Sequence, residues 1–187
     1  MAKQQVIEKV EPLRTAEEIK NIREALMQTN YPKRNLLLFN IGINTGLRIS
    51  DVLNLRIEDV KGKTILKVRE QKTSKIRKVY LDSLMVDIAE YLEDKPDEGY
   101  LFESRFKGKP ISTVQAYRIL AGAGEKCGYN YVGTHSCRKT FGFHYYKKTK
   151  DVATLMEIFN HDSQSITKKY IGIRDDEIKD SLKDFKL

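Results

Sequence analysis

The chain contains few cysteines and no long apolar segment. Among its 187 residues are two cysteines, Cys127 and Cys137, and no apolar run is long enough to span a membrane or to form an N-terminal signal. We therefore expect a cytoplasmic protein with both thiols reduced and with no membrane partner. The sequence also lacks internal repeats and low-complexity tracts, so it gives no sign of a repeat architecture.

The few cysteines and histidines do not form a recognisable zinc site. The four considered as zinc ligands are Cys127, His135, Cys137 and His161. However, no pair has the tight spacing of a C-x-x-C motif, and residues two positions apart on a helix, such as His135 and Cys137, point to different faces. Buried structural cysteine is therefore the better interpretation of both thiols, and we expect no metal site.

The charge of the chain is positive but moderate. It has 34 Lys and Arg against 26 Asp and Glu, which gives a formal net charge of +8. A basic chain of this kind favours a polyanion such as nucleic acid as its partner. Charged residues of both signs make up 32% of the sequence, so an ordinary soluble surface remains an alternative on composition alone.

Apolar residues recur mainly at helical spacing. Residues 1–12 are polar and end in Pro12, so we interpret them as a tail or linker and residues 13–187 as one domain. Helix starts are marked by capping motifs such as Thr15-x-x-Glu18. The predicted helices cover approximately residues 16–28, 33–44, 52–55, 83–93, 112–126, 135–148 after a Thr134 cap, 152–159 after an Asp151 cap, and a short segment from Ser163 that carries Tyr170. The second of them is apolar on nearly every side, which places it in the middle of the core.

One segment alternates with a period of two and predicts a β-hairpin. Residues 64–69 and 75–81 form the two strands, with a turn around residues 70–74. The predicted fold class is therefore α+β, mainly α-helical with a small antiparallel β-hairpin or sheet. A final helix follows Gly172, and we expect its apolar stripe to be buried on its own domain or on a neighbouring subunit. The stripe consists of Ile173, Ile178, Leu182 and Phe185.

The last third of the chain contains a set of residues suited to phosphodiester chemistry. His135 and Arg138 are three positions apart on a predicted helix and therefore share one face. His161 and Tyr170 follow within the same third of the chain. A phenol nucleophile, two imidazoles and a planar guanidinium together suit attack on a phosphate. On its own, a His-x-x-Arg pair is more often an ordinary feature of a helix surface.

Further basic residues precede this set. Arg48 lies in a turn between two helices, where an arginine is more often an ordinary surface residue. The functional interpretation is that the turn fixes the guanidinium near the site and that Asp51, about one helical turn on, orients it through a charge-assisted contact. Lys72 lies in the hairpin turn and suits a phosphate contact, a general acid or a merely solvated tip. Other basic side chains on the hairpin, the loop 104–110 and the His-x-x-Arg helix are candidates for contacts with a nucleic-acid backbone. These candidates are Lys75, Arg77, Arg105, Lys107 and Lys139.

Taken in order, these residues resemble the catalytic domain of tyrosine recombinases, the phage integrase family. The resemblance covers roughly residues 15–173 and rests on Arg48, Lys72, His135, Arg138, His161 and Tyr170. The sequence departs from the family pattern at Lys139, where a histidine is common, and at Asn160, where a glycine is common. Family members generally also carry an N-terminal domain that clamps DNA, so we expect either a catalytic fragment or a naturally short member.

The resemblance implies the fold of a tyrosine recombinase catalytic domain and a site-specific DNA recombinase activity. By it, Tyr170 attacks the scissile phosphate and forms a 3′-phosphotyrosyl intermediate, with no metal and no cofactor. Arg48 and Arg138 hold the phosphate oxygens. Lys72, or less favourably Lys75, donates a proton to the departing oxygen. His135 acts as general base or acid, His161 binds the phosphate, and the third histidine, His144, faces away from the site.

The implied partners are double-stranded DNA, further copies of the chain in a tetramer on DNA, and accessory DNA-bending proteins. The tail helix, residues 174–187, is expected to be exchanged between subunits. The implied setting is the cytoplasm, in a bacterial, phage or mobile-element context and in association with the nucleoid. Two alternatives stay open: a DNA-binding or regulatory module that no longer cuts, and strand nicking and closing like that of type IB topoisomerases.

Overall fold

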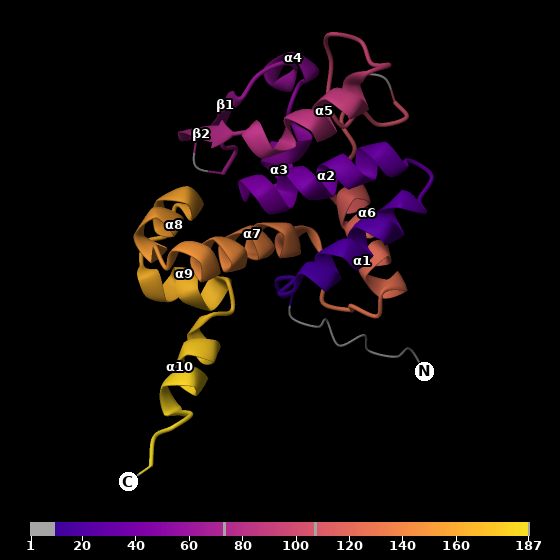
Figure 1. Ribbon diagram of the computed structural model, residues 1–187. Coiled ribbons are helices and arrows are strands. Elements are labelled where there is room, and N and C mark those ends of the chain that lie inside the picture. The colour runs from indigo at the N-terminus through magenta and orange to yellow at the C-terminus, as the bar shows by residue number, and fades with distance from the viewer. Residues whose placement is uncertain (1–9, 73, 107, 187) are drawn as a thin grey trace, which may run out of the picture.

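The computed structural model describes residues 10–72, 74–106 and 108–186, and these are mainly helical (Figure 1). In chain order the elements are α1 (Ala16–Met27), α2 (Pro32–Thr45), α3 (Ile49–Leu53), α4 (Ile57–Val60), β1 (Ile65–Arg69), β2 (Ile76–Tyr80), the 3-10 turn η1 (Asp82–Leu84), α5 (Met85–Leu92), α6 (Thr113–Lys126), α7 (Thr134–Thr149), α8 (Val152–Phe159), α9 (Gln164–Tyr170) and α10 (Arg174–Leu182). The predicted α+β class is confirmed.

Helix α2 forms the centre of the core, as its apolar sequence predicts. It packs against α1, α5 and α7, and Leu38, Phe39 and Ile41 are almost completely buried. The helix ends at Gly46, which adopts a left-handed conformation with φ of 62°. A Cβ atom at this position would lie 2.4 Å from the ring of Phe141, so both the backbone conformation and the space require glycine. This turn therefore determines the position of Arg48, two residues later.

The two strands pair as the predicted antiparallel hairpin. Ile65 lies opposite Tyr80, and Arg69 lies opposite Ile76. Leu66, Val68 and Val79 point inward and are buried, which is the alternation expected of a half-buried strand. The hairpin therefore packs one face on the helices and carries its turn toward solvent.

The chain divides around α7 into two regions that we name by their residues. The body comprises residues 10–140 and contains the larger apolar cluster. The tail lobe comprises residues 141–173 and is built around a smaller cluster of buried side chains: Phe143, Tyr146, Leu155, Phe159, Ile171 and Ile173. The first half of α7 packs on α2, where a Cβ on Gly42 would lie 2.8 Å from Cys137 Cβ. The second half supports α8 and α9 (Figure 1).

Several helix boundaries differ from the sequence-based expectation. Helix α3 begins at Ile49, three residues earlier than predicted, with Arg48 as its N-cap residue. Helix α7 begins at Thr134, which we expected to cap it; Gly133 is the N-cap residue, and the Ser136 hydroxyl accepts the Gly133 N–H. The short helix α4 was not predicted. Such ends are set by local hydrogen bonds rather than by apolar periodicity.

The final helix α10 points away from the body (Figure 1). Ile173 at its start is buried, whereas Ile178, Leu182 and Phe185 are 50%, 57% and 67% exposed. The predicted apolar stripe is thus uncovered over most of its length. Among the helices of the described residues, none has both the length and the apolar character needed to cross a bilayer.

Candidate active site

The two predicted arginines converge on one backbone carbonyl. Arg138 donates from Nη1 to the Gly46 carbonyl at 2.5 Å and from Nη2 to the Phe159 carbonyl at 2.9 Å. Arg48 also donates from Nη2 to the Phe159 carbonyl, at 3.4 Å. Arg48 lies directly before α3 and Arg138 lies in α7, and the two guanidiniums meet at the carbonyl of Phe159, the last residue of α8. The spatial convergence expected from the sequence is therefore present.

A carboxylate that the sequence did not single out orients Arg48. Glu70, which is 3% exposed, accepts a hydrogen bond from Arg48 Nη1 at 2.7 Å. We expected Asp51 in this role, but its Oδ1 accepts the backbone N–H of Gln71 at 2.9 Å and thereby anchors the hairpin turn. Burial raises the pKa of Asp51. The alternation of β1 contained the signal for Glu70, because it lies two residues after the buried Val68.

The guanidinium groups form a buried cationic cluster. Arg138 is 3% exposed, and burial lowers its pKa to about 10, with the positive charges of Arg48 and Arg77 acting in the same direction. Arg138 also lies over the Phe159 ring at 4.3 Å. Arg138 still carries its charge at pH 7, so the site presents preorganised positive charge to an anion.

Tyr170 ends α9 beside both candidate histidines. Its hydroxyl lies 3.3 Å from His135 Nδ1, and its ring packs edge-on against His161 with the centroids 5.2 Å apart. Burial raises the pKa of Tyr170, while the positive charges of Arg138 and Arg48 oppose that rise. His161 Nδ1 lies 3.1 Å from the Thr167 hydroxyl. Partial burial and the nearby cations lower the pKa of both histidines below 6.5, so both are neutral at pH 7.

A cavity of about 320 Å³ opens over these groups and is lined by Arg48, Ile49, Ser50, Lys72, Thr134, His135 and Arg138. Its size falls within the range of small-ligand sites. Lys72 is exposed in the hairpin turn at the edge of this cavity. The other candidate lysine, Lys75, instead donates to the side chain of Asn160, at the junction of α8 and α9. The structure thus places Lys72, rather than Lys75, with the arginines.

Two of the five basic residues expected at a nucleic-acid backbone are structural instead. Arg77 lies opposite Val68 and so faces inward, where its Nη2 donates to the Thr45 carbonyl at 2.5 Å. Lys139 is 9% exposed and donates to the Val10 carbonyl at 2.6 Å. Both side chains are directed to backbone acceptors, because the face of the strand or helix that each one occupies turns it inward.

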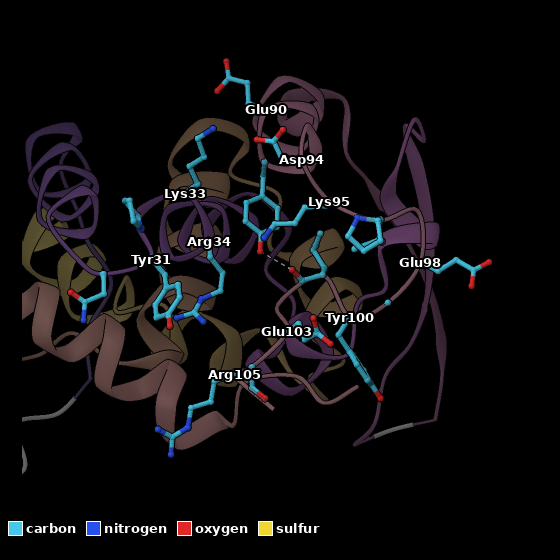
Figure 2. Close-up of a pocket in the computed structure, with 18 residues that line it drawn as sticks. Tyr31, Lys33, Arg34, Glu90, Asp94, Lys95, Glu98, Tyr100, Glu103 and Arg105 are labelled. Atoms are coloured by element: carbon cyan, nitrogen blue, oxygen red, sulfur yellow. Dashed lines mark hydrogen bonds between the residues drawn. The ribbon is translucent and has the colours of Figure 1, made fainter. Parts of the chain in front are cut away.

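Arg105 is exposed, but it lies far from the arginine cluster. It sits over the Phe106 ring at 4.9 Å and lines a second cavity of about 650 Å³ with Tyr31 and Arg34 (Figure 2). That cavity lies at the start of α2, whereas Arg48 follows the end of this 14-residue helix, about 20 Å away. None of the six candidate catalytic residues lines it. Lys107 lies outside the described residues.

His144 and Cys137 behave as the sequence predicts, whereas Cys127, which was also expected to be buried, is only partly buried. His144 Nε2 lies 3.0 Å from the Leu13 carbonyl, away from the cavity over Arg48. Cys137 is buried, and burial raises its thiol pKa to about 12. Within the described residues, no three His, Cys, Asp or Glu side chains cluster closely enough to hold a metal ion.

Comparison with known proteins decides the family. Residues 14–177 match the model of the phage integrase family. The chain belongs to the phage integrase family. It is 48% identical over 177 residues to the probable integrase/recombinase YoeC of Bacillus subtilis (strain 168), which covers 94% of this chain and 97% of YoeC. It is 34% identical over 173 residues to the tyrosine recombinase XerA of Pyrococcus furiosus, covering 90% of this chain and 59% of XerA.

Solved structures support the same fold. A crystal structure of XerA recombinase matches with a TM-score of 0.72 at 24% identity, over 92% of this chain and 65% of that chain. A λ integrase dimer bound to a core site matches with a TM-score of 0.68 at 20% identity, over 89% of this chain and 49% of that chain. The expected tyrosine recombinase fold and enzyme class are confirmed at the level of the integrase family. The roles of individual residues stay predictions.

Proposed function

We propose that this integrase-family chain cleaves and rejoins double-stranded DNA at a specific site through a covalent 3′-phosphotyrosyl intermediate. One observation carries the proposal: the Tyr170 hydroxyl lies 3.3 Å from His135 Nδ1, beside two guanidiniums that share the Phe159 carbonyl. Similar proteins support it, since the solved structures of this fold include the recombinase XerH and λ integrase bound to their DNA sites.

The first step is an in-line displacement at phosphorus. The Tyr170 oxygen forms a bond to phosphorus while its proton passes to neutral His135. The bond between phosphorus and the 5′-oxygen breaks, and Lys72 gives that oxygen a proton. In the second step a 5′-hydroxyl from another strand attacks the phosphotyrosine and releases Tyr170. The number of phosphodiester bonds is conserved, so the reaction needs no nucleotide cofactor.

The arginines bind the non-bridging oxygens and stabilise charge that grows in the transition state. We assign them no proton transfer, because their N–H groups are held by the Glu70 carboxylate and by the carbonyls of Gly46 and Phe159. The Lys72 ammonium, at the edge of the cavity, is therefore the better candidate for the general acid. His161, held through Nδ1 by Thr167, is assigned to the phosphate through its other ring nitrogen.

A suicide substrate with a nick beside the cleavage site tests the proposal. Cleavage releases a short fragment that carries the free 5′-hydroxyl, and once this fragment has diffused away the covalent intermediate cannot be rejoined. We expect a covalent protein–DNA adduct that disappears in Tyr170→Phe. No adduct on a substrate that the protein binds specifically would leave a DNA-binding module as the better account. Resolution of a synthetic four-way junction favours strand exchange, whereas relaxation of supercoils without resolution favours topoisomerase-like nicking and closing.

The assignment of Lys72 can be separated from that of Lys75. A substrate with sulfur in place of the bridging 5′-oxygen needs no proton donor, because a thiolate leaves readily. The Lys72→Ala variant should fail to cleave the oxygen substrate but should cleave the sulfur substrate at nearly the wild-type rate. Lys75→Ala, which removes the contact with Asn160, serves as the matched control. If the sulfur substrate restored cleavage only in Lys75→Ala, Lys75 rather than Lys72 would be the general acid.

We further propose that a tetramer assembles on DNA through exchange of the tail helix, with accessory DNA-bending proteins where the site requires them. The exposed Ile178, Leu182 and Phe185 supply the apolar surface that a neighbouring subunit would cover. Leu182→Asp together with Phe185→Asp should abolish multi-subunit complexes in a gel-shift assay and spare single-site binding. Unchanged assembly in this double variant would contradict tail exchange.

A further inference from the structure

The segment before α1 crosses α7 next to the active site. We call residues 10–14 the strap. The Leu13 N–H donates to the Thr140 hydroxyl at 2.9 Å, and the Leu13 carbonyl lies 3.0 Å from His144 Nε2. Leu13 itself is fully buried. These contacts fix the strap along successive turns of α7, the helix that also carries His135 and Arg138.

Lys139 connects the strap to the proposed nucleophile. Its Nζ donates to the Val10 carbonyl at 2.6 Å and lies 5.3 Å from the centre of the Tyr170 ring. The side chain is 9% exposed, so its ammonium must be stabilised by neighbouring groups rather than by water. A carbonyl oxygen and the face of an aromatic ring both stabilise a cation. The buried Lys139 ammonium is therefore stabilised by both the strap and Tyr170.

The other end of the strap holds the chain directly after Tyr170. Arg14 donates from Nη2 to the Gly172 carbonyl at 3.1 Å and from Nη1 to Asp176 at 2.7 Å. A Cβ atom on Gly172 would lie 2.9 Å from Arg14 Nη2, so the two segments are in close contact. The strap is therefore linked to the tyrosine segment at two points: at the Tyr170 ring through Lys139, and after Tyr170 through Arg14.

We propose that Lys139 is a positioning residue for Tyr170, and that the strap, through Lys139 and Arg14, sets the distance between the tyrosine and the arginine cluster. This inference rests on the proposed function, in which Tyr170 is the nucleophile. The arginines do not depend on the strap, because Arg138 is held by the carbonyls of Gly46 and Phe159. Release of the strap should therefore slow cleavage and leave phosphate binding unchanged.

Single-turnover cleavage of the suicide substrate at saturating protein tests this separation. Lys139→Met keeps the apolar stem and removes the ammonium; we expect the rate to fall roughly 10- to 100-fold, the loss typical of a small misplacement of reacting groups. DNA affinity should not change. Lys139→Arg should restore most of the rate, because a guanidinium also donates to a carbonyl and stacks on a ring. Lys148→Met, on the exposed end of the same helix, is the control.

Arg14→Met provides a second variant that does not disturb the buried core, since the Arg14 side chain is 39% exposed. Like Lys139→Met, it should slow cleavage. A rate within twofold of wild type in both Lys139→Met and Arg14→Met would overturn the proposal. So would a loss of rate in Lys139→Met that Lys139→Arg does not restore.

Hydrogen exchange of the free protein gives a readout that does not depend on catalysis. Amides of residues 164–172 should exchange faster in Lys139→Met and Arg14→Met than in Lys148→Met. Faster exchange with no adduct formed by any variant or by the wild type would contradict the proposed function and leave the link between strap and tyrosine supported. If exchange of these amides were unchanged in both variants while the wild type cleaved DNA normally, the link between strap and tyrosine would be overturned and the proposed function would stand.

Discussion

The body and the tail lobe hold their parts of the site in different ways. In the body, Arg48 is fixed by the buried carboxylate of Glu70 and Arg138 by the Gly46 carbonyl, and both arginines also donate to the Phe159 carbonyl of the tail lobe. In the tail lobe, Tyr170 rests on a much smaller apolar cluster and on contacts from α7 and the strap. Regions with fewer buried contacts open at lower free energy. The difference indicates that phosphate binding is preorganised, whereas delivery of the nucleophile is adjustable.

Phe159 joins the two regions. Its side chain is fully buried in the tail-lobe cluster, and its carbonyl accepts hydrogen bonds from both arginines. Any movement of α8 therefore moves an acceptor of the cationic cluster. This single residue explains how a segment late in the chain can be placed relative to Arg48, which lies 111 residues earlier.

The largest expected effect comes from the body. Arg138→Ala should lower the single-turnover cleavage rate by about 10² to 10³, because it removes a preorganised donor to the transition state. Arg138→Lys should not restore the rate, since an ammonium cannot span the carbonyls of Gly46 and Phe159 as the planar guanidinium does. A loss below tenfold in Arg138→Ala would show that the cluster is not preorganised for the phosphate.

A pair of glycines on neighbouring helices tests the packing of the tail lobe. A Cβ on Gly142 would lie 2.6 Å from Ile171 Cγ2 and 2.8 Å from Phe159 Cε2, whereas nothing lies within 4 Å of one on Gly122. Gly142→Ala should lower the free energy of unfolding by about 1 to 3 kcal/mol through overpacking. Gly122→Ala, within α6, should raise it by roughly 0.5 to 1 kcal/mol. Urea denaturation of both variants measures this, and equal stabilities would contradict the close packing.

The smallest expected effect is a pH dependence at the boundary between the regions. Burial and the nearby Arg138 lower the folded-state pKa of His135 below its usual 6.5. The unfolded chain then takes up protons first as the pH falls, so folding stability is unaffected above about pH 6.5 and decreases below it. Neutral His135 should likewise keep cleavage active until the pH falls below 6.5. Denaturation midpoints between pH 7.5 and 5.5 should change less in His135→Gln than in wild type.

The sequence predicted the elements better than their contacts. Apolar periodicity located the core helix α2 and the hairpin because burial of a face imposes that periodicity. The convergence of the arginines and Tyr170 was implied by the resemblance to tyrosine recombinases, which rests on the order and spacing of six residues. Helix ends such as that of α7 were missed, because the Gly133 N–H finds the Ser136 hydroxyl through a local choice of hydrogen bonds.

The partners of charged residues were the least predictable. Asp51 and Glu70 both lie near Arg48, and sequence distance favoured Asp51, whereas the tertiary fold brings Glu70 within 2.7 Å. Arg77 and Lys139 counted as surface cations until the fold gave them backbone acceptors. Ion pairs over long sequence separations depend on the packing of whole elements, which local patterns do not contain.

Mass spectrometry of the trapped protein–DNA adduct tests the central claim most directly. Trypsin cuts after Lys169 and Arg174, so the proposed nucleophile lies on the short peptide from Tyr170 to Arg174. After nuclease digestion, we expect this peptide to carry a nucleotide joined to Tyr170 through its 3′-phosphate. A nucleotide on any other peptide, or one joined through its 5′-phosphate, would contradict the proposed role of Tyr170.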